Sequence, residues 1–338
     1  MSACEIGSWR GNPLALLELA RGISAAELAG GFALPDASDL RGQIEDEYVR
    51  RLGALPPATR RLMLLAAADP VGDATLLWRA AQTLGIESEA AEPAATDQLL
   101  EIGARVRFRH PLVRSAAYRA ASTADRQAAH GALAAATDPE TDPDRRVWHR
   151  AHAAIGPHEE VAAELVDSAG RAQRRGGIAA AAAFLERAVA FTPDPAERAS
   201  RGLSAARAKF AAGDLAAAES LLATAEVGPL DELDQAEVER MRAQIAFDLR
   251  RGSDAPPLLL RAAQRFERLD AELARTTYLE AVLAAIYAAR LANGTDLADV
   301  ARAARSTSLG SEPLPARQLL LLGLATRLTD GYAAAAPT

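Results

Sequence analysis

The residues best able to do chemistry in this chain are its histidines, its lysine and its cysteine. His149 and His152 are three residues apart, so they share one face of a helix, where two imidazoles could bind a metal ion. No third ligand follows at the required spacing, and we interpret the pair as a polar helix face beside Trp148. His130 stands in an alanine-rich stretch and is predicted to be structural. The sequence therefore predicts no metal site.

Lys209 is the single lysine of the chain. A nucleotide-binding P-loop needs a lysine between a glycine-rich loop and a serine or threonine, whereas Lys209 lies between Ala208 and Phe210. No dinucleotide fingerprint follows a strand, and Ser115 and Ser168 lack the strand–turn–helix setting of a nucleophilic serine. The acidic residues are spread at the spacing of exposed helix faces. The sequence predicts no catalytic residue and a protein that is not an enzyme.

Composition narrows the class of protein further. The 338 residues carry a formal net charge of −7, which argues against a chain dominated by attraction to nucleic acid or membrane. Hydrophobic residues make up 49% and aromatic residues only 4%, a mixture that favours closely packed helices over β-sandwiches. Cys4 is the single cysteine and excludes an intrachain disulfide. The N-terminus does not resemble a secretory signal, so we expect a cytoplasmic protein.

The elements that must position these residues begin with short helices. Asp73 is a predicted N-cap of a helix that ends near Gly85. Residues 105–109 alternate polar and apolar side chains behind a turn at Gly103, which predicts one strand of a small hairpin. A helix is predicted to follow over 111–120. Short helices, a small hairpin and another helix are the pattern of a winged helix.

The hairpin region is also basic. Its arginines could contact phosphates as the wing of a DNA reader, but alternating arginines on an exposed hairpin are also a common solvated face, which we favour. The residues are Arg105, Arg107, Arg109, Arg114 and Arg119.

After about residue 165 the chain repeats itself. Residues 174–181 are echoed by 210–217, with Gly177 and Gly213 separated by 36 positions. Each glycine is predicted to end a helix, and the alanines beyond it let the next helix pack closely, as in tetratricopeptide repeats of about 34 residues. Such units stack into a solenoid. Later glycines in comparable settings are Gly252, Gly294 and Gly331.

Several motifs, in this order and spacing, resemble large actinobacterial LuxR-type transcriptional regulators. The resemblance covers nearly the whole chain. The motifs are GNPLALLEL at 11–19, LPPATR at 55–60, AAADP at 66–70, FRHPLVRSAAY at 108–118, WH at 148–149, RRGG at 174–177, ERA at 186–188 and PPLLL at 256–260.

The resemblance implies a signal-transduction ATPase of the STAND type. Its members have a P-loop nucleotide domain, a helical lid, a winged helix, a tetratricopeptide-like sensor superhelix and a C-terminal helix-turn-helix that binds DNA. ATP and an inducer together switch an ADP-bound monomer into an oligomer. By this resemblance Pro13 would pack against adenine and His110 would contact the ADP β-phosphate. Read alone, the same residues are a helix-start proline and a capping histidine.

The domains expected from these observations form an all-α protein with one small hairpin. The P-loop domain would precede Met1 and the helix-turn-helix would follow Thr338, so we expect no cofactor on this chain alone and ATP or ADP only in full-length members. The predicted domains are a lid remnant at 1–48, a winged-helix-like domain at 49–135, a helical connector at 136–170 and truncated tetratricopeptide-like repeats at 171–338.

The predicted function is that of a regulator fragment serving as a signal-sensing and interaction scaffold. Its expected partners are a small-molecule or protein inducer on the solenoid and a second copy of the chain. DNA would be bound only through the helix-turn-helix outside the chain, and no membrane is expected. The alternative is a freestanding tetratricopeptide-type adaptor that binds another protein.

Overall fold

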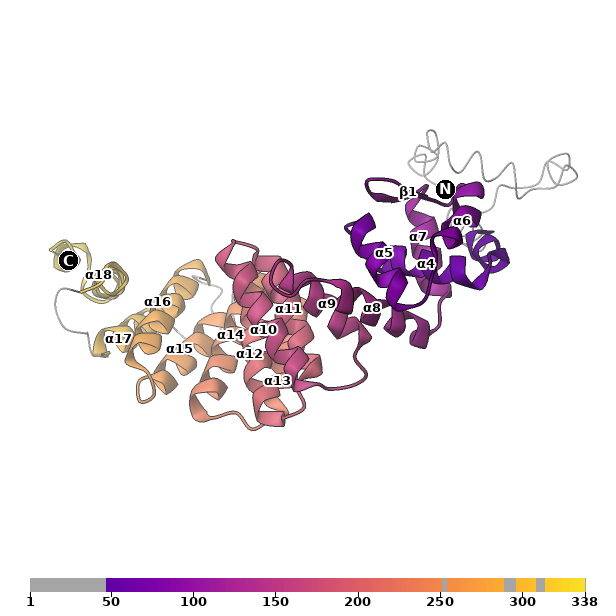
Figure 1. Cartoon of the computed structure of the whole chain (residues 1–338). Coiled ribbons are helices and arrows are strands. Elements are labelled where there is room, and N and C mark those ends of the chain that lie inside the picture. The colour runs from indigo at the N-terminus through magenta and orange to yellow at the C-terminus, as the bar shows by residue number, and fades with distance from the viewer. Residues whose placement is uncertain (1–46, 251–253, 289–295, 308–313, 338) are drawn as a thin grey trace, which may run out of the picture. The chain divides into compact units, whose positions relative to one another are not determined.

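The protein is predominantly helical, as its composition predicts, and within the residues described its sheet content is one two-stranded hairpin. It divides into two compact units, with residues 47–155 described in the first and residues from 156 onward in the second. Each unit is treated by itself. The structure is a computed structural model that describes residues 47–250, 254–288, 296–307 and 314–337 (Figure 1).

Some of the sequence predictions fall outside those ranges. Pro13, Cys4 and nearly all of the predicted lid remnant 1–48 are among them. Gly252 and Gly294, two of the later repeat glycines, are not described either. The division between the two units falls inside the stretch 136–170 that was predicted as one connector.

Short helices build the first unit around a central helix. Proline at the first turn starts α4, and Asp73 caps the next helix by accepting from the backbone N–H groups of Thr75 and Leu76, as predicted. The elements are a helix at 47–54, α4 (Pro57–Ala68), α5 (Ala74–Thr83), η2 (Ser88–Ala91), α6 (Glu92–Thr96), β1 (Leu100–Ile102), β2 (Val106–Phe108), α7 (Pro111–Ala120), α8 (Thr123–Ala136) and α9 (Pro143–Ala153).

The core of the first unit forms on the apolar face of α4. Leu62 and Leu65 are completely buried and belong to one cluster with Leu76 of α5, Val113 of α7 and Leu133 of α8. Burial of a leucine side chain contributes about 2 kcal/mol. This core holds α7, α8 and the end of α4 together, and the polar network described below uses those three elements.

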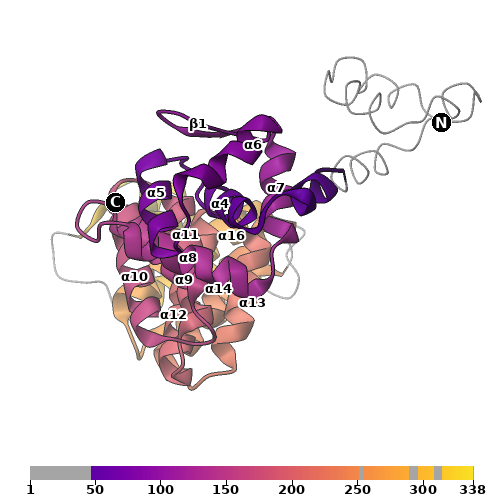
Figure 2. The same ribbon diagram turned by 45° about the vertical axis from the view of Figure 1, so that its right-hand side comes forward.

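The predicted hairpin is present, beside α6 (Figure 2). Its antiparallel strands pair Leu100 with Phe108 and Ile102 with Val106. A third segment joins it, because the N–H of Val106 donates to the carbonyl of Gly72 at 2.9 Å. Gly72 has a φ of +70°, and a Cβ there would lie 2.7 Å from the Val106 carbonyl oxygen. The close approach therefore requires glycine at position 72.

The second unit is a run of helices in chain order, from magenta to yellow in Figure 1. Each helix packs against the next, and α12 also contacts α14 while α16 contacts α18. The helices are α10 (Glu159–Arg174), α11 (Ile178–Phe191), α12 (Pro195–Ala211), α13 (Leu215–Glu226), α14 (Glu232–Arg250), α15 (Ala255–Phe266), α16 (Ala271–Ala288), α17 (Leu297–Ser306), α18 (Ala316–Asp330) and α19 (Tyr332–Ala335).

Two glycines end α10 and α12 with the same geometry. Gly176 and Gly213 have φ values of 78° and 81°. Each donates its N–H to the carbonyl three residues earlier, and the following residue donates to the carbonyl five residues earlier, which is the Schellman pattern. By backbone geometry, Gly213 therefore corresponds to Gly176, 37 positions earlier. The sequence pattern predicts Gly177 as its counterpart instead. The left-handed conformation falls on the first glycine of the pair.

Replacement of the glycine at the end of α12 is expected to destabilise the second unit. Gly213→Ala is expected to lower the free energy of unfolding of the second unit by about 1–2 kcal/mol, because alanine disfavours positive φ. Gly170→Ala is the matched control: it lies inside α10, where the new Cβ makes an ordinary 3.5 Å contact, and is expected to stabilise by about 0.5–1 kcal/mol. Hydrogen exchange of α12 and α10 amides measures both. Loss of protection in both variants would contradict the assignment.

Candidate functional site

His110, the described residue to which the family resemblance gives a ligand contact, begins α7. Its Nδ1 accepts the N–H of Leu112 at 3.1 Å, so the side chain caps the helix. A ring nitrogen that accepts a backbone N–H carries no proton, and the proton of the neutral imidazole therefore lies on Nε2. His110 is half-buried and presents a fixed donor atom. Pro13, the other predicted site residue, lies outside the described residues.

A hollow of about 250 Å³ has Pro111, the residue that follows His110, in its wall, whereas His110 itself does not line it. Two charged side chains line it, Asp69 and Arg114. Arg114 donates from Nε to the carbonyl of Ala67 at 2.9 Å, which ties α7 to the end of α4. The hollow therefore presents a carboxylate and a guanidinium that are both already hydrogen-bonded within the unit.

Asp69, directly after α4, is the centre of a buried polar network. Arg145 of α9 donates to it twice, from Nε to Oδ1 at 3.1 Å and from Nη2 to Oδ2 at 2.7 Å. The N–H of Gly72 also donates to Oδ2, at 3.0 Å. Asp69 is only 6% exposed. This buried two-point arginine–carboxylate pair fixes α9 against the turn at residues 69–72. The same turn precedes α5 and bonds to the hairpin through Gly72.

A chain of hydrogen bonds between histidines extends this network. The hydroxyl oxygen of Tyr118 lies 2.9 Å from Nε2 of His130, and Nδ1 of His130 lies 2.9 Å from Nδ1 of His149. Nε2 of His149 lies 3.9 Å from Oδ1 of Asp69. Neutral rings satisfy this order when Tyr118 donates to His130, His130 donates to His149, and the remaining proton of His149 faces the carboxylate. The chain joins α7, α8 and α9 to the end of α4.

His149 is completely buried. The prediction that it lies on a polar helix face is therefore wrong. In α9 the His149 side chain faces α8, where it is bonded to His130. Sequence periodicity alone does not show which polar residue of a helix will face a neighbouring helix. Burial lowers the pKa of His149 to about 4, with Arg145 and His152 acting in the same direction and Asp69 and Asp142 opposing it. The ring is therefore neutral at neutral pH.

His152, the second member of the predicted pair, lies between two rings. It stacks on His130 with ring centroids 4.7 Å apart and contacts Trp148 at 4.6 Å. Within the part of the chain that the structure describes, no group of three or more histidine, cysteine or acidic side chains is arranged to hold a metal ion. His130 is buried, in agreement with its predicted structural role.

The basic residues of the hairpin divide into two kinds. Arg105, Arg107 and Arg109 are exposed, and Arg107 stands opposite Glu101 in the strand register. Arg114 instead makes the structural bond to α4 described above. Lys209 is also tied down, because its Nζ lies 2.7 Å from Oε2 of Glu186 and hydrogen bonding there raises the pKa of the lysine.

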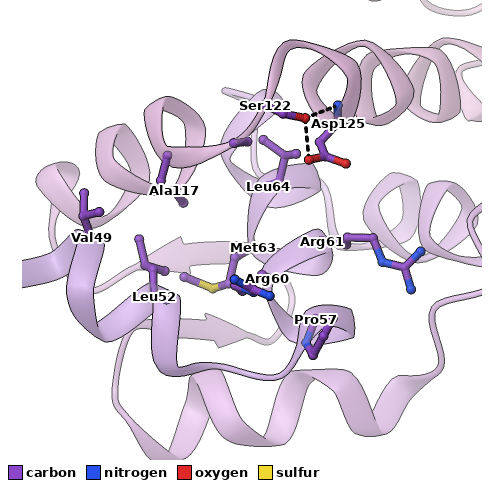
Figure 3. A pocket seen from close by; sticks show the side chains of 13 residues that line it. Val49, Leu52, Pro57, Arg60, Arg61, Met63, Leu64, Ala117, Ser122 and Asp125 are labelled. Carbon is purple, nitrogen blue, oxygen red and sulfur yellow. Dashed lines mark hydrogen bonds between the residues drawn. The ribbon is translucent and has the colours of Figure 1, made fainter.

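A larger groove, of about 470 Å³, lies elsewhere in the first unit (Figure 3). Its apolar floor includes Leu52 and Met63, and Arg60 and Arg61 of α4 line it together with Asp125. The hydroxyl of Ser122 donates to Asp125 at 2.6 Å and caps α8. Two arginines and one aspartate line this groove, so its charged lining carries a net positive charge.

Comparisons with known proteins find no relative of this chain. No protein-family model matches it, and no curated protein and no solved structure is similar to it at a significant level. Among the helices described, none has the length and apolar character needed to cross a membrane. The features that bear on function are therefore the helix order and the side-chain contacts within each unit.

Proposed function

We propose that this chain is the central part of a LuxR-type transcriptional regulator, in which it acts as a signal-sensing and interaction scaffold. In the full-length protein this part would couple the ATP or ADP state and inducer binding to DNA binding by a separate domain. The chain itself would not hydrolyse ATP. The proposal is supported by the order of elements in the first unit, the succession of helices in the second unit and the geometry of His110.

The order of elements in the first unit supports a winged-helix assignment. Helices α4 and α5 flank Asp73, which forms an isolated bridge with Arg105 at the edge of the hairpin. The short η2 and α6 follow, then the hairpin, then α7. Helix, short strand, helix, helix and a two-stranded wing is the order of a winged helix, and the bridge at Asp73 takes the place of its first strand.

The second unit supports a repeat assignment of the tetratricopeptide kind. Antiparallel helix pairs follow one another, the glycine turn after α10 recurs after α12, and alternate helices α12 and α14 also touch. The small residues of the pattern allow neighbouring helices to approach closely. A Cβ on Gly202 of α12 would lie 3.3 Å from Cβ of Ala225 in α13, which is a tight contact, so glycine at this position lets the two helices pack closely.

The observation that carries the proposal is the geometry of His110. The resemblance gives this residue a contact with the ADP β-phosphate, for which it must offer a hydrogen-bond donor. Because Nδ1 accepts the N–H of Leu112, the neutral ring carries its proton at Nε2. A histidine fixed in this way favours the nucleotide state whose phosphate it can reach, which is how a ligand shifts a conformational equilibrium.

The DNA that flanks the coding sequence tests the proposal. We expect it to encode a P-loop domain upstream and a helix-turn-helix downstream, in frame or in an adjoining reading frame. Intact flanking sequence that encodes neither would count against the regulator. Turnover of ATP by the purified chain would contradict the proposed scaffold role.

A freestanding adaptor is the second candidate, and exposed apolar side chains favour it. Leu249 of α14, Tyr287 of α16 and Leu320 of α18 are all at least 49% exposed on the second unit. Exposed apolar side chains of this size are available for contact with a partner. Affinity capture that returns one stable protein partner, with no effect of nucleotide on the complex, would favour the adaptor over the regulator.

A further inference from the structure

The second unit contains a groove of about 240 Å³ lined by the consecutive helices α14, α15 and α16 and by one residue of α12. Its walls are mainly apolar and aromatic, and the rings of Phe247 and Tyr287 meet edge to face with centroids 5.9 Å apart. Tyr287 is 74% exposed, which is unusual for so large an aromatic side chain. The apolar side chains lining the groove are Phe210, Phe247, Leu259, Leu283, Ala284 and Tyr287.

The polar lining of this groove has one sign of charge. Glu280 of α16 and Asp248 of α14 contribute carboxylates, and Gln244 contributes an amide. No lysine or arginine is among the described side chains that line it. Aromatic faces and carboxylates together favour cations, because the ring quadrupole and the carboxylate charge both attract positive charge.

Glu280 already has partners in the protein. Its Oε1 accepts from Nη1 of Arg240 at 2.8 Å, and its Oε2 is buried. Arg240 is shared, since it also donates to both carboxylate oxygens of Glu237, at 2.8 and 2.9 Å. Burial raises the pKa of Glu280, while Arg240 and Gln244 oppose the rise. Gln244 also hydrogen-bonds the Glu280 side chain, so a cation in the groove would act on this carboxylate through its charge and not by filling an empty hydrogen-bond position at Oε2.

We propose that this groove binds a small organic cation, an ammonium group on an aromatic body. The ammonium pairs with the charge of the Glu280 carboxylate, and the body packs against Phe247, Tyr287 and Leu283. The inference rests on the proposed function in one respect: it names the chemical class of the inducer that the second unit would sense.

Calorimetric titration of the whole chain with a matched pair of probes tests this inference. The pair is 4-phenylbutylamine and 4-phenylbutanol, which share a body and differ in the charged donor. We expect the amine to bind at least about tenfold more tightly than the alcohol at neutral pH. In Glu280→Gln, which keeps the side-chain shape and removes the charge, the two affinities are expected to come within about twofold of each other.

Two further variants locate the binding. Glu272→Gln removes the same charge from the same helix outside the groove and is expected to leave both affinities unchanged. Tyr287→Ala removes an exposed wall, so both probes are expected to bind more weakly without loss of helix content. Equal binding of amine and alcohol to the unchanged protein, or an equal loss in Glu272→Gln, would overturn the proposal.

A third probe separates small molecules from protein partners. Lysine blocked at its α-amino and carboxyl groups carries the ammonium on an aliphatic stem, as a protein side chain does. It is expected to bind more weakly than 4-phenylbutylamine, and tighter binding would overturn the small-molecule proposal. These titrations use only this chain, so their failure is distinct from a failure of the regulator proposal, which the flanking DNA decides.

Discussion

Asp69→Ala is expected to be the most damaging single substitution in the polar network of the first unit, lowering its free energy of unfolding by about 3–5 kcal/mol. The substitution leaves Arg145, whose side chain is only 13% exposed, without its two-point partner. Asp73 and Asp142 lie 3.5 and 3.7 Å from Nη1 of Arg145 and compensate only in part. The N–H of Gly72 also loses its acceptor.

Urea unfolding followed by tryptophan fluorescence measures this loss selectively. Trp9, Trp78 and Trp148 are the only tryptophans, and all precede residue 156, so the signal reports the first unit. Arg50→Ala is the matched control, since it removes one partner of an ion pair with Glu47 in the same unit at an exposed position. We expect the control to cost below about 1 kcal/mol. Equal losses in the two variants would refute the role given to burial of the Asp69–Arg145 pair.

Acidification is expected to destabilise the first unit through His149. The pKa of this histidine is about 4 in the folded protein and about 6.5 as a free side chain. Between these two values the unfolded chain binds a proton that the folded chain does not, so the free energy of unfolding falls as the pH falls from 6.5 to 4. The full difference amounts to about 3 kcal/mol.

Urea midpoints measured across this pH window test the assignment, with His149→Gln as the variant. Glutamine keeps a polar side chain at the position but does not titrate, so its unfolding is expected to depend less steeply on pH between 6.5 and 4. The groups that face His149 come from three sides: His130 from α8, Asp69 after α4, and Arg145, Asp142 and His152 from its own helix and cap. An unchanged slope in the variant would assign the pH dependence to those neighbours instead.

Local chemistry was enough to predict several elements. The helix over 111–120 is α7, bounded as expected, because Pro111 starts it and a β-region residue ends it. Asp73 caps α5 as its type predicts, and Gly85 follows that helix with a positive φ. Alternation over 105–109 identified β2, whereas β1 has the same length but follows Leu99, a second apolar residue that breaks the alternation before Leu100. These features depend on residues adjacent in sequence.

The candidate site was predictable only in part. The capping role of His110 follows from its place before Pro111, and the structure confirms it. Its contact with ADP stays a prediction. The glycines predict a repeat, but the predicted counterpart of Gly213 is one residue away from the one that shares its geometry. Two glycines stand together at 176 and 177, and the sequence does not show which of them adopts positive φ. The groove at Glu280 had no sequence signal, since an isolated glutamate in an apolar helix has the appearance of a surface residue.

What the sequence determined by itself was therefore local and compositional: a helical chain with a small hairpin, helix ends at particular caps and glycines, and a single lysine that fits no P-loop. Tertiary structure alone decided which polar side chains meet. Asp69 and Arg145 are 76 residues apart, and His130 and His149 are 19 apart on different helices. Periodicities of 3.6 and 2 define the faces of an element, whereas the contact between two faces is set by how whole helices pack.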